Sequence, residues 1–222
     1  MKPLEVITIL LTAGTLLSLL FYRRKGPFLY LLFLTAIVTI VQYLVGGLRW
    51  QMLVALYILP AMFITYKFKI ENSFTGAVLG IWFLISAYIP WAVPVFTMPA
   101  PNGDFSVGSE TFHWVDSSRL EWFTHENDSD LREIMVQVWY PSGDSNSIVP
   151  NPYMDFMKLR SKTLASAGKI PAFLPSHLDM IMTNTRKEVD CSEKLGKYPV
   201  FIFSHGITGS RHLHQVLFEH IA

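Results

Sequence analysis

YPVFIFSHGITGS, residues 198–210, is the stretch that decides the fold of the second half of the chain. Its first part, residues 198–203, is an apolar run bounded by a proline and a glycine, which is typical of a strand buried on both faces of a parallel sheet. A His-Gly pair and a turn of small residues follow. Residues 211–222 then predict an amphipathic helix, whose apolar stripe is formed by Leu213, Val216, Leu217 and Ile221.

The turn after this strand indicates a place where negative charge is stabilised. In the α/β-hydrolase fold, a strand, a turn and a helix in this order supply one backbone N–H of the oxyanion hole, and the other comes from the residue after the nucleophile. Two other interpretations fit less well. Gly206-Ile207-Thr208-Gly209 lacks the spacing and the lysine of a phosphate-binding loop. Ser204 is not flanked by the glycines of Gly-x-Ser-x-Gly, so we do not assign it as a nucleophile.

The histidines and the cysteine do not predict a metal centre. His212, His214 and His220 follow the turn, but helix positions two apart point in different directions, so we expect these side chains on the surface. The single cysteine, Cys191, excludes an internal disulfide and a cysteine cluster. It also lies in a polar stretch without a motif that activates a thiolate. We therefore expect neither a metal nor a cofactor.

The residues upstream of residue 198 predict strands and then helices. Residues 109–116 and 120–124 predict short, aromatic-rich strands separated by a turn, and residues 131–140 predict a longer strand whose side chains alternate between two faces. Three antiparallel strands are therefore expected. The acidic stretch 126–130 lacks the glycine and the distal glutamate of an EF-hand loop and is interpreted as a solvated hairpin loop. Residues 153–166 and 174–184 predict two methionine-rich helices, which either pack on the core or present an adaptable surface to a lipid-like ligand.

Two segments together resemble a known enzyme family. Residues 135–141 (MVQVWYP) and 198–206 (YPVFIFSHG) are similar to the bacterial and plasma platelet-activating-factor acetylhydrolases, which are related to dienelactone hydrolases. The resemblance covers about residues 105–222. It implies an outward-facing serine esterase that acts on short or oxidised acyl esters of phospholipid-like substrates, without a metal. It also implies that the backbone N–H of Ile207 is an oxyanion donor, while His205, Gly206 and Gly209 shape the turn.

The catalytic triad of that family is not in these residues. In the α/β-hydrolase fold the order is Ser, then Asp or Glu, then His, all downstream of the helix that begins near residue 211. The chain reaches Ala222 within this helix. We therefore expect the N-terminal part of an α/β-hydrolase domain with an incomplete sheet, truncated before the nucleophile and inactive by itself.

The first half of the chain has a different composition. Residues 1–99 hold 7 Lys or Arg and 2 Asp or Glu, whereas residues 100–222 hold 11 and 15. Four apolar stretches, 4–22, 27–46, 50–66 and 74–98, are each near the ~20 residues that a helix needs to cross a bilayer. A four-helix transmembrane region, 1–99, is thus predicted before the hydrolase part, 100–222. The basic residues that follow the first stretch argue against a cleaved signal peptide.

The basic residues of the short loops predict the orientation. Lys and Arg near span ends favour the cytoplasmic side. Residues 23–25 are all basic and the third loop carries Lys67 and Lys69, whereas the second loop has Arg49 alone. We therefore expect a multi-pass protein of the cell membrane whose residues after Pro99 lie outside the cytoplasm.

Two functional hypotheses follow from the two halves. The first is the membrane-anchored esterase, whose partners are the lipid bilayer and an ester substrate. The second is a membrane-embedded sensor or interaction module with a degenerate outer domain. The formal net charge of +1 gives no basic excess for a nucleic acid, so none is expected as a partner.

Overall fold

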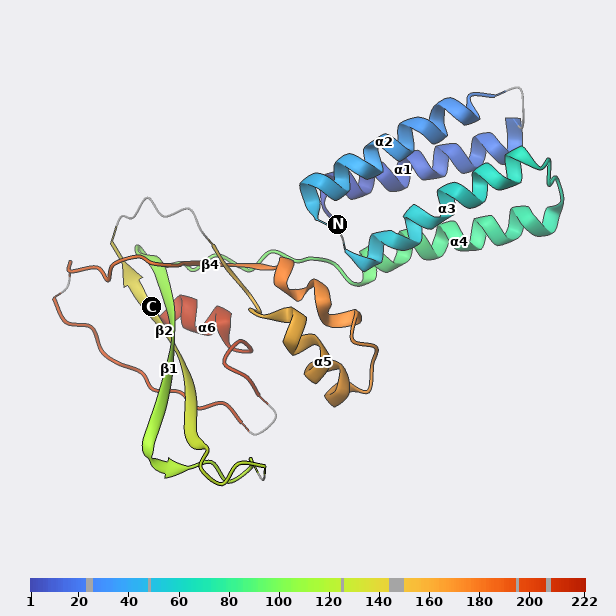
Figure 1. Ribbon diagram of the computed structural model, residues 1–222. Coiled ribbons are helices and arrows are strands. Elements are labelled where there is room, and N and C mark those ends of the chain that lie inside the picture. Colours follow the sequence, from blue (N-terminus) through green and yellow to red (C-terminus); the bar gives the residue numbers. More distant parts are fainter. Residues whose placement is uncertain (23–25, 48, 125, 144–149, 195, 207–208) are drawn as a thin grey trace. The chain divides into compact units, whose positions relative to one another are not determined.

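The computed structural model describes residues 1–22, 26–47, 49–124, 126–143, 150–194, 196–206 and 209–222. The chain forms two compact units. The helical unit consists of Met1–Phe96 and Lys158–His177, and the sheet unit consists of Thr97–Met157 and Leu178–Ala222. Figure 1 labels most of the elements of both units.

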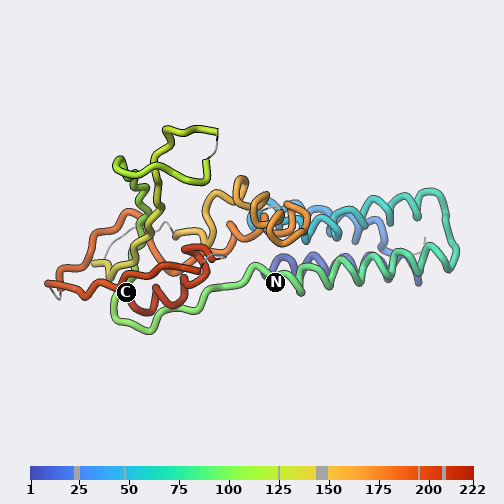
Figure 2. The backbone as a smooth tube through the Cα atoms, turned by 90° about the horizontal axis from the view of Figure 1, so that it is seen from below, coloured from blue at the N-terminus to red at the C-terminus, as the bar shows by residue number. Residues whose placement is uncertain are grey.

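The helical unit contains four long helices at the predicted apolar stretches. Helix α1 (Pro3–Leu17) continues as a π-helical turn to Tyr22, and α2 (Phe28–Gly46), α3 (Trp50–Lys67) and α4 (Ser73–Ala92) follow. All four of these described helices are long and apolar enough to cross a membrane. Figure 2 shows them running alongside one another. The fourth ends at Ala92 rather than at the predicted residue 98, because Pro94 lacks an N–H and disfavours helical geometry at Val93.

The four helices carry polar groups inside and apolar groups outside. Phe28, Ile58 and Met62 form part of a small buried apolar cluster. Many other large apolar side chains of the helices, such as Phe33 and Leu44, are exposed. The interior also holds a series of hydroxyl side chains, which donate to carbonyls one turn back or meet across helices: Thr8, Thr12, Thr15, Thr35, Thr39 and Ser86. This arrangement suits lipid, where apolar surface costs nothing and polar groups need internal partners.

A later segment of the chain joins the helical unit. Helix α5 (Met157–Gly168) begins and ends later than the predicted helix 153–166, and a 3-10 helix spans Leu174–Met180. At the start of α3, the Trp50 indole Nε1 donates to the Leu174 carbonyl oxygen over 3.2 Å. The Trp50 ring also meets the edge of the Phe173 ring, with 5.3 Å between centroids.

The predicted helix over residues 174–184 is wrong at its end. The 3-10 helix stops at Met180, and Met182–Arg186 forms strand β4. Thr183 and Thr185 are β-branched, which favours extended backbone. Both side chains are buried, and their hydroxyl groups form hydrogen bonds. Of the apolar residues in the two predicted helices, Met154, Met157 and Ile181 are buried, while Phe156 and Leu159 are exposed.

The sheet unit contains a four-stranded mixed sheet with the order β2-β1-β4-β3. Strands β1 (Ser106–Leu120) and β2 (Leu131–Ser142) pair antiparallel, β1 and β4 pair parallel, and β3 (Pro150–Pro152) pairs antiparallel with β4. Strand β1 covers the predicted strand 109–116 and continues to Leu120, with a register shift between Asp116 and Leu120. The predicted strand 120–124 is wrong, because residues 121–124 are not in a strand. The antiparallel pairing of β1 with residues 131–140 is as expected.

The Trp-Tyr-Pro segment at the end of β2 has a specific packing role. The Tyr140 ring covers Gly108 of β1, where a Cβ atom would lie 2.4 Å from Tyr140 Cε2. The Tyr140 hydroxyl donates to the Val189 carbonyl oxygen over 2.7 Å. Tyr140 thus ties β2 to the chain that leaves β4, and it requires glycine opposite its ring.

Residues 198–203 do not form the predicted strand. Their backbone is not paired with any of the four described strands, and the side chains of Val200 and Ile202 are 84% and 96% exposed. A strand exists only when a neighbouring backbone accepts and donates its hydrogen bonds. The apolar run is present, but the neighbours that would complete a parallel sheet around it are not among the described residues.

Candidate functional site

The predicted turn is closed by its own backbone. The Gly209 N–H donates to the Gly206 carbonyl oxygen over 2.8 Å. His205 Nδ1 lies 2.9 Å from the same oxygen, so a proton on Nδ1 is donated to it. A Cβ atom at Gly209 would lie 3.1 Å from both the Gly206 oxygen and the His205 Cβ, so the turn favours glycine there. Ile207, the predicted oxyanion donor, lies outside the described residues.

Aromatic contacts hold the chain that enters the turn. The Phe203 ring lies 4.9 Å from the His214 ring and 5.3 Å from the Phe218 ring, both centroid to centroid. The Phe218 ring in turn lies 4.5 Å from that of Trp139 on β2. Helix α6 (Gln215–Ile221) thereby connects the residues before the turn with the sheet.

Charged and polar contacts hold the chain that leaves the turn. Arg211 Nη2 donates to Asp155 Oδ2, and Arg211 Nη1 donates to Gln137 Oε1 over 3.2 Å. The Gln137 amide donates from Nε2 to Ser109 Oγ over 2.9 Å. Arg211 therefore links the turn to β2, to β1 through Gln137, and to the segment that follows β3.

His212 is buried, which corrects the surface position expected for it. Its ring is 4% exposed, with Nε2 3.3 Å from Asp155 Oδ1 and Nδ1 3.3 Å from Ser210 Oγ. The sequence pattern missed this contact because Asp155 lies far upstream and carries no motif. His214 and His220 are exposed, as expected. Among the described residues, no three metal-ligating side chains come together.

Ser210, His212 and Asp155 are the residue types of a hydrolase triad, but their geometry does not support that role. The contact between His212 Nε2 and Asp155 Oδ1 is not an aligned hydrogen bond. Arg211 also neutralises the Asp155 charge that would have to stabilise an imidazolium. Ser210 is not on a nucleophile elbow either, because no Gly-x-Ser-x-Gly occurs in the sequence.

Helix α6 presents its apolar stripe outward. Leu213, Leu217 and Ile221 are about half exposed, whereas Gln215 and Glu219 on the opposite face are buried. Glu219 explains this orientation, because its carboxylate accepts hydrogen bonds from the Asn184 backbone and side-chain amides and from Gln215 Nε2. A buried carboxylate with three donors is satisfied, so the polar face packs on β4.

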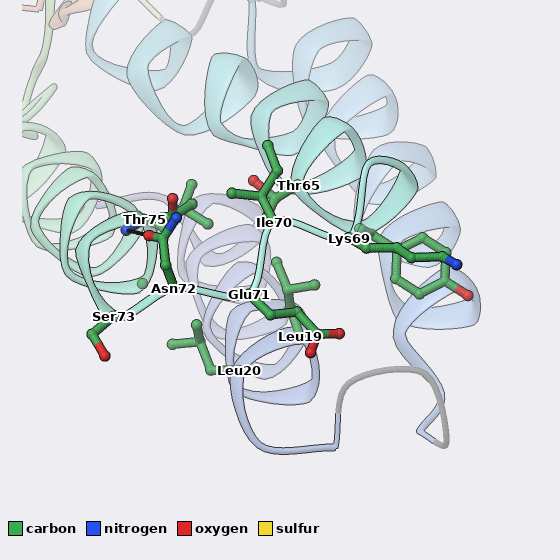
Figure 3. Close-up of a pocket in the computed structure, with 12 residues that line it drawn as sticks. Leu19, Leu20, Thr65, Lys69, Ile70, Glu71, Asn72, Ser73 and Thr75 are labelled. Carbon is green, nitrogen blue, oxygen red and sulfur yellow. Dashed lines mark hydrogen bonds between the residues drawn. The ribbon is translucent and has the colours of Figure 1, made fainter.

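A cavity of about 240 Å³ lies in the helical unit where α3 turns into α4 (Figure 3). Its lining includes Leu19, Leu79 and Asn72, and the Asn72 side chain caps α4 by accepting from the Thr75 N–H over 2.7 Å. Among the described residues, no histidine or cysteine lines it, while its polar lining includes Ser73, Lys69 and Glu71. The cavity belongs to the helical unit rather than to residues 198–210, and the turn at Gly206 stays the candidate site.

A comparison with protein-family models agrees with the resemblance in the sequence. The model described as platelet-activating factor acetylhydrolase, isoform II, matches residues 92–222, which are more than half of the chain. A search of curated proteins and a search of solved structures gave no significant match. The family expected from residues 135–141 and 198–206 is thus confirmed, and the matched region contains the turn and all of its supporting contacts.

Proposed function

The chain belongs to the platelet-activating factor acetylhydrolase isoform II family, and from this membership we propose that it forms the N-terminal part of a membrane-anchored serine ester hydrolase. The substrates are short or oxidised acyl esters of lipid-like molecules. The reaction is acyl transfer to a serine followed by hydrolysis, and by family resemblance it uses no metal and no cofactor.

The turn at Gly206–Gly209 is the observation that carries this proposal. It is closed by the hydrogen bond from Gly209 N–H to the Gly206 oxygen and follows an apolar run, as the oxyanion loop of an α/β-hydrolase does. In the proposed reaction, the Ile207 N–H donates to the oxygen of the tetrahedral intermediate. Such a donor is effective because it already points toward the position at which negative charge develops in the transition state.

The nucleophile lies in sequence other than these 222 residues. A Gly-x-Ser-x-Gly elbow does not occur among them, and the triad order of the fold places Ser, acid and His after the first helix that follows the oxyanion loop. One oxyanion donor without a nucleophile offers no covalent route to hydrolysis. We propose that residues 1–222 alone are inactive.

The helical unit acts as the membrane anchor. Its four helices have the length and composition of membrane spans, and their outward side chains are largely apolar. The basic residues of the first and third loops favour a topology with residues after Pro99 outside the cytoplasm. This would place the hydrolase part beside the bilayer, where ester lipids are concentrated.

A labelling experiment tests this function. Membranes that contain the complete gene product should hydrolyse a short-chain aryl ester, and a serine-directed fluorophosphonate should label the protein and stop the turnover. Residues 1–222 expressed alone, at the same level, should neither be labelled nor exceed the rate of buffer with detergent. Turnover and labelling of the 222-residue chain would contradict the proposal that the nucleophile lies outside these residues. A complete gene product without either would refute the hydrolase function.

A further inference from the structure

We infer that residues 158–173, which we call the basic segment, bind the headgroups of anionic phospholipids, and that Lys158, Lys162 and Lys169 contact the lipid phosphates. The inference rests on the proposed membrane anchor. It adds to the four spanning helices a segment that lies on the surface of the bilayer.

The basic segment belongs to the helical unit, although it follows the first three strands in the chain. Trp50, the first residue of α3, holds the end of the segment. Its ring lies 5.3 Å from that of Phe173 and 6.4 Å from that of His177, centroid to centroid, and its indole donates to the carbonyl oxygen between them at Leu174. In a bilayer that α3 spans, the first residue of α3 lies at the headgroup level, which tryptophan favours. The end of the basic segment is therefore held at that level.

Helix α5, which makes up most of the basic segment, has one packed face and one open side. Met157, Ser161 and Ala165 follow one another at intervals of four residues, and all three are buried. The open side carries apolar as well as basic groups, since Leu159 is 73% exposed, and Phe173 beyond the helix is 53% exposed. With 12 residues, α5 is too short to cross the ~30 Å hydrocarbon core. Exposed apolar side chains together with lysines are typical of a helix that lies in the membrane interface.

The charge of the basic segment is opposite to that of the rest of the second half of the chain. Residues 158–173 hold 4 Lys or Arg and no Asp or Glu, whereas the remainder of residues 100–222 holds 7 and 15. An anionic membrane surface therefore attracts this segment and repels most of the sheet unit. Lys158, Lys162 and Lys169 are exposed, and the first two lie one helical turn apart on the same side of α5.

The combination of groups favours a lipid surface over a soluble phosphate. A bilayer presents many phosphates in one plane, and its acyl boundary accepts Leu159 and Phe173 at the same time. Each lysine near an anionic surface contributes about a 5-fold shift in the equilibrium between the docked and the free segment. A zwitterionic lipid has no net charge to attract the lysines, so the preference is for anionic headgroups.

Reconstitution of residues 1–222 into lipid nanodiscs tests the inference. A polarity-sensitive fluorophore on Ser166→Cys, in a Cys191→Ser background, reports the surroundings of α5, because Ser166 is exposed on that helix. In discs of phosphatidylcholine with phosphatidylglycerol we expect blue-shifted emission and quenching by spin-labelled lipid, and both should be weaker in phosphatidylcholine alone. Lys158→Gln with Lys162→Gln should lower the ratio of docked to free segment about 25-fold. Salt at ~1 M should act in the same direction, because it shortens the Debye length to ~3 Å.

Two further variants separate the charge of this segment from charge in general. Lys194→Gln with Lys197→Gln removes the same charge from exposed positions outside the segment and should leave the fluorescence unchanged. Lys158→Arg with Lys162→Arg keeps the charge and should retain the docking. An inserted chain whose fluorescence is the same with and without phosphatidylglycerol would overturn the inference, and so would equal losses in the two glutamine variants. A chain that does not insert into the discs would instead refute the membrane anchor, and the inference with it.

Discussion

Arg49 and Glu5 form a fully buried ion pair in the helical unit, with 3.0 Å between Arg49 Nη1 and Glu5 Oε1 and neither side chain more than 1% exposed. Arg49 Nη2 also donates to the carbonyl oxygens of Pro90 and Val93, each over 3.3 Å. Glu5 accepts from the Lys2 backbone N–H. The pair therefore joins the beginning of α1 and α3 to the end of α4, and it compensates the single basic charge of the second loop.

The ion pair predicts a large loss of stability when one partner is removed. Glu5→Gln leaves the Arg49 charge buried without its counter-ion, which should cost roughly 3–5 kcal/mol. The thermal midpoint of the chain in detergent measures this. Changing both residues to Met should be much less harmful than the single change, because no unpaired charge remains. Lys67→Met, at an exposed helix end, serves as a control. Equal losses in the single and double variants would show that the charges do not interact.

The asymmetry of basic residues predicts the membrane topology. An alkaline phosphatase fused after Gly103 should be active, because that enzyme matures only in an oxidising outer compartment. Fusions after Lys25 and after Lys69 should be inactive while a cytoplasmic reporter is active at the same two points. The opposite pattern would reverse the orientation and place the hydrolase part in the cytoplasm.

The oxyanion role predicts that the backbone of Ile207 matters more than its side chain. In the complete gene product, Ile207→Ala keeps the N–H and should lose little activity, whereas Ile207→Pro removes the donor. Loss of one oxyanion donor lowers turnover by about 10²- to 10³-fold, or about 2.7–4 kcal/mol. KM should change less than kcat. The comparison requires a folded proline variant, shown by a thermal midpoint close to that of the wild type. Near-normal turnover in that variant would assign the loop donor elsewhere.

The packing of Tyr140 predicts a pH dependence at the alkaline end. Burial raises the pKa of the Tyr140 phenol above its ordinary value of 10.0, and nearby acidic groups add to this. The neutral phenol is the form that donates to the Val189 oxygen, so its contribution to stability is complete below pH 10 and is lost as the pH rises through the raised pKa. Tyr140→Phe should cost about 1 kcal/mol at neutral pH.

Thermal midpoints of the wild type and of Tyr140→Phe between pH 7 and pH 12 check this. The gap between the two proteins should be constant at neutral pH and close at the alkaline end. A gap that widens with pH would mean that the ionised form is the one that the fold prefers. Gly108→Ala complements the test, since its Cβ would enter the space of the Tyr140 ring and should destabilise the sheet unit at every pH.

The sequence by itself determined the helices, strands and motifs that depend on residues close together in the chain. Hydrophobic length predicted the four long helices to within a few residues, except that α4 ends at Ala92. Residues 109–116 and 131–140 predicted strands, which pair antiparallel in β1 and β2, whereas the expected strand over 120–124 is not formed. Residues 135–141 and 198–206 also sufficed to place the chain in its family, because these motifs are contiguous and need no knowledge of long-range contacts.

Only the tertiary structure decided which polar groups meet. Asp155 and Arg211, like Glu5 and Arg49, are ordinary charged residues in the sequence, and nothing in their spacing connects them. Periodicity identified the apolar stripe of α6 but not the face that is buried, and the three hydrogen bonds to Glu219 bury the polar face. The physical reason is the same in each case: a buried charge must find a partner, and the partner is chosen by the packing of distant segments rather than by the local pattern.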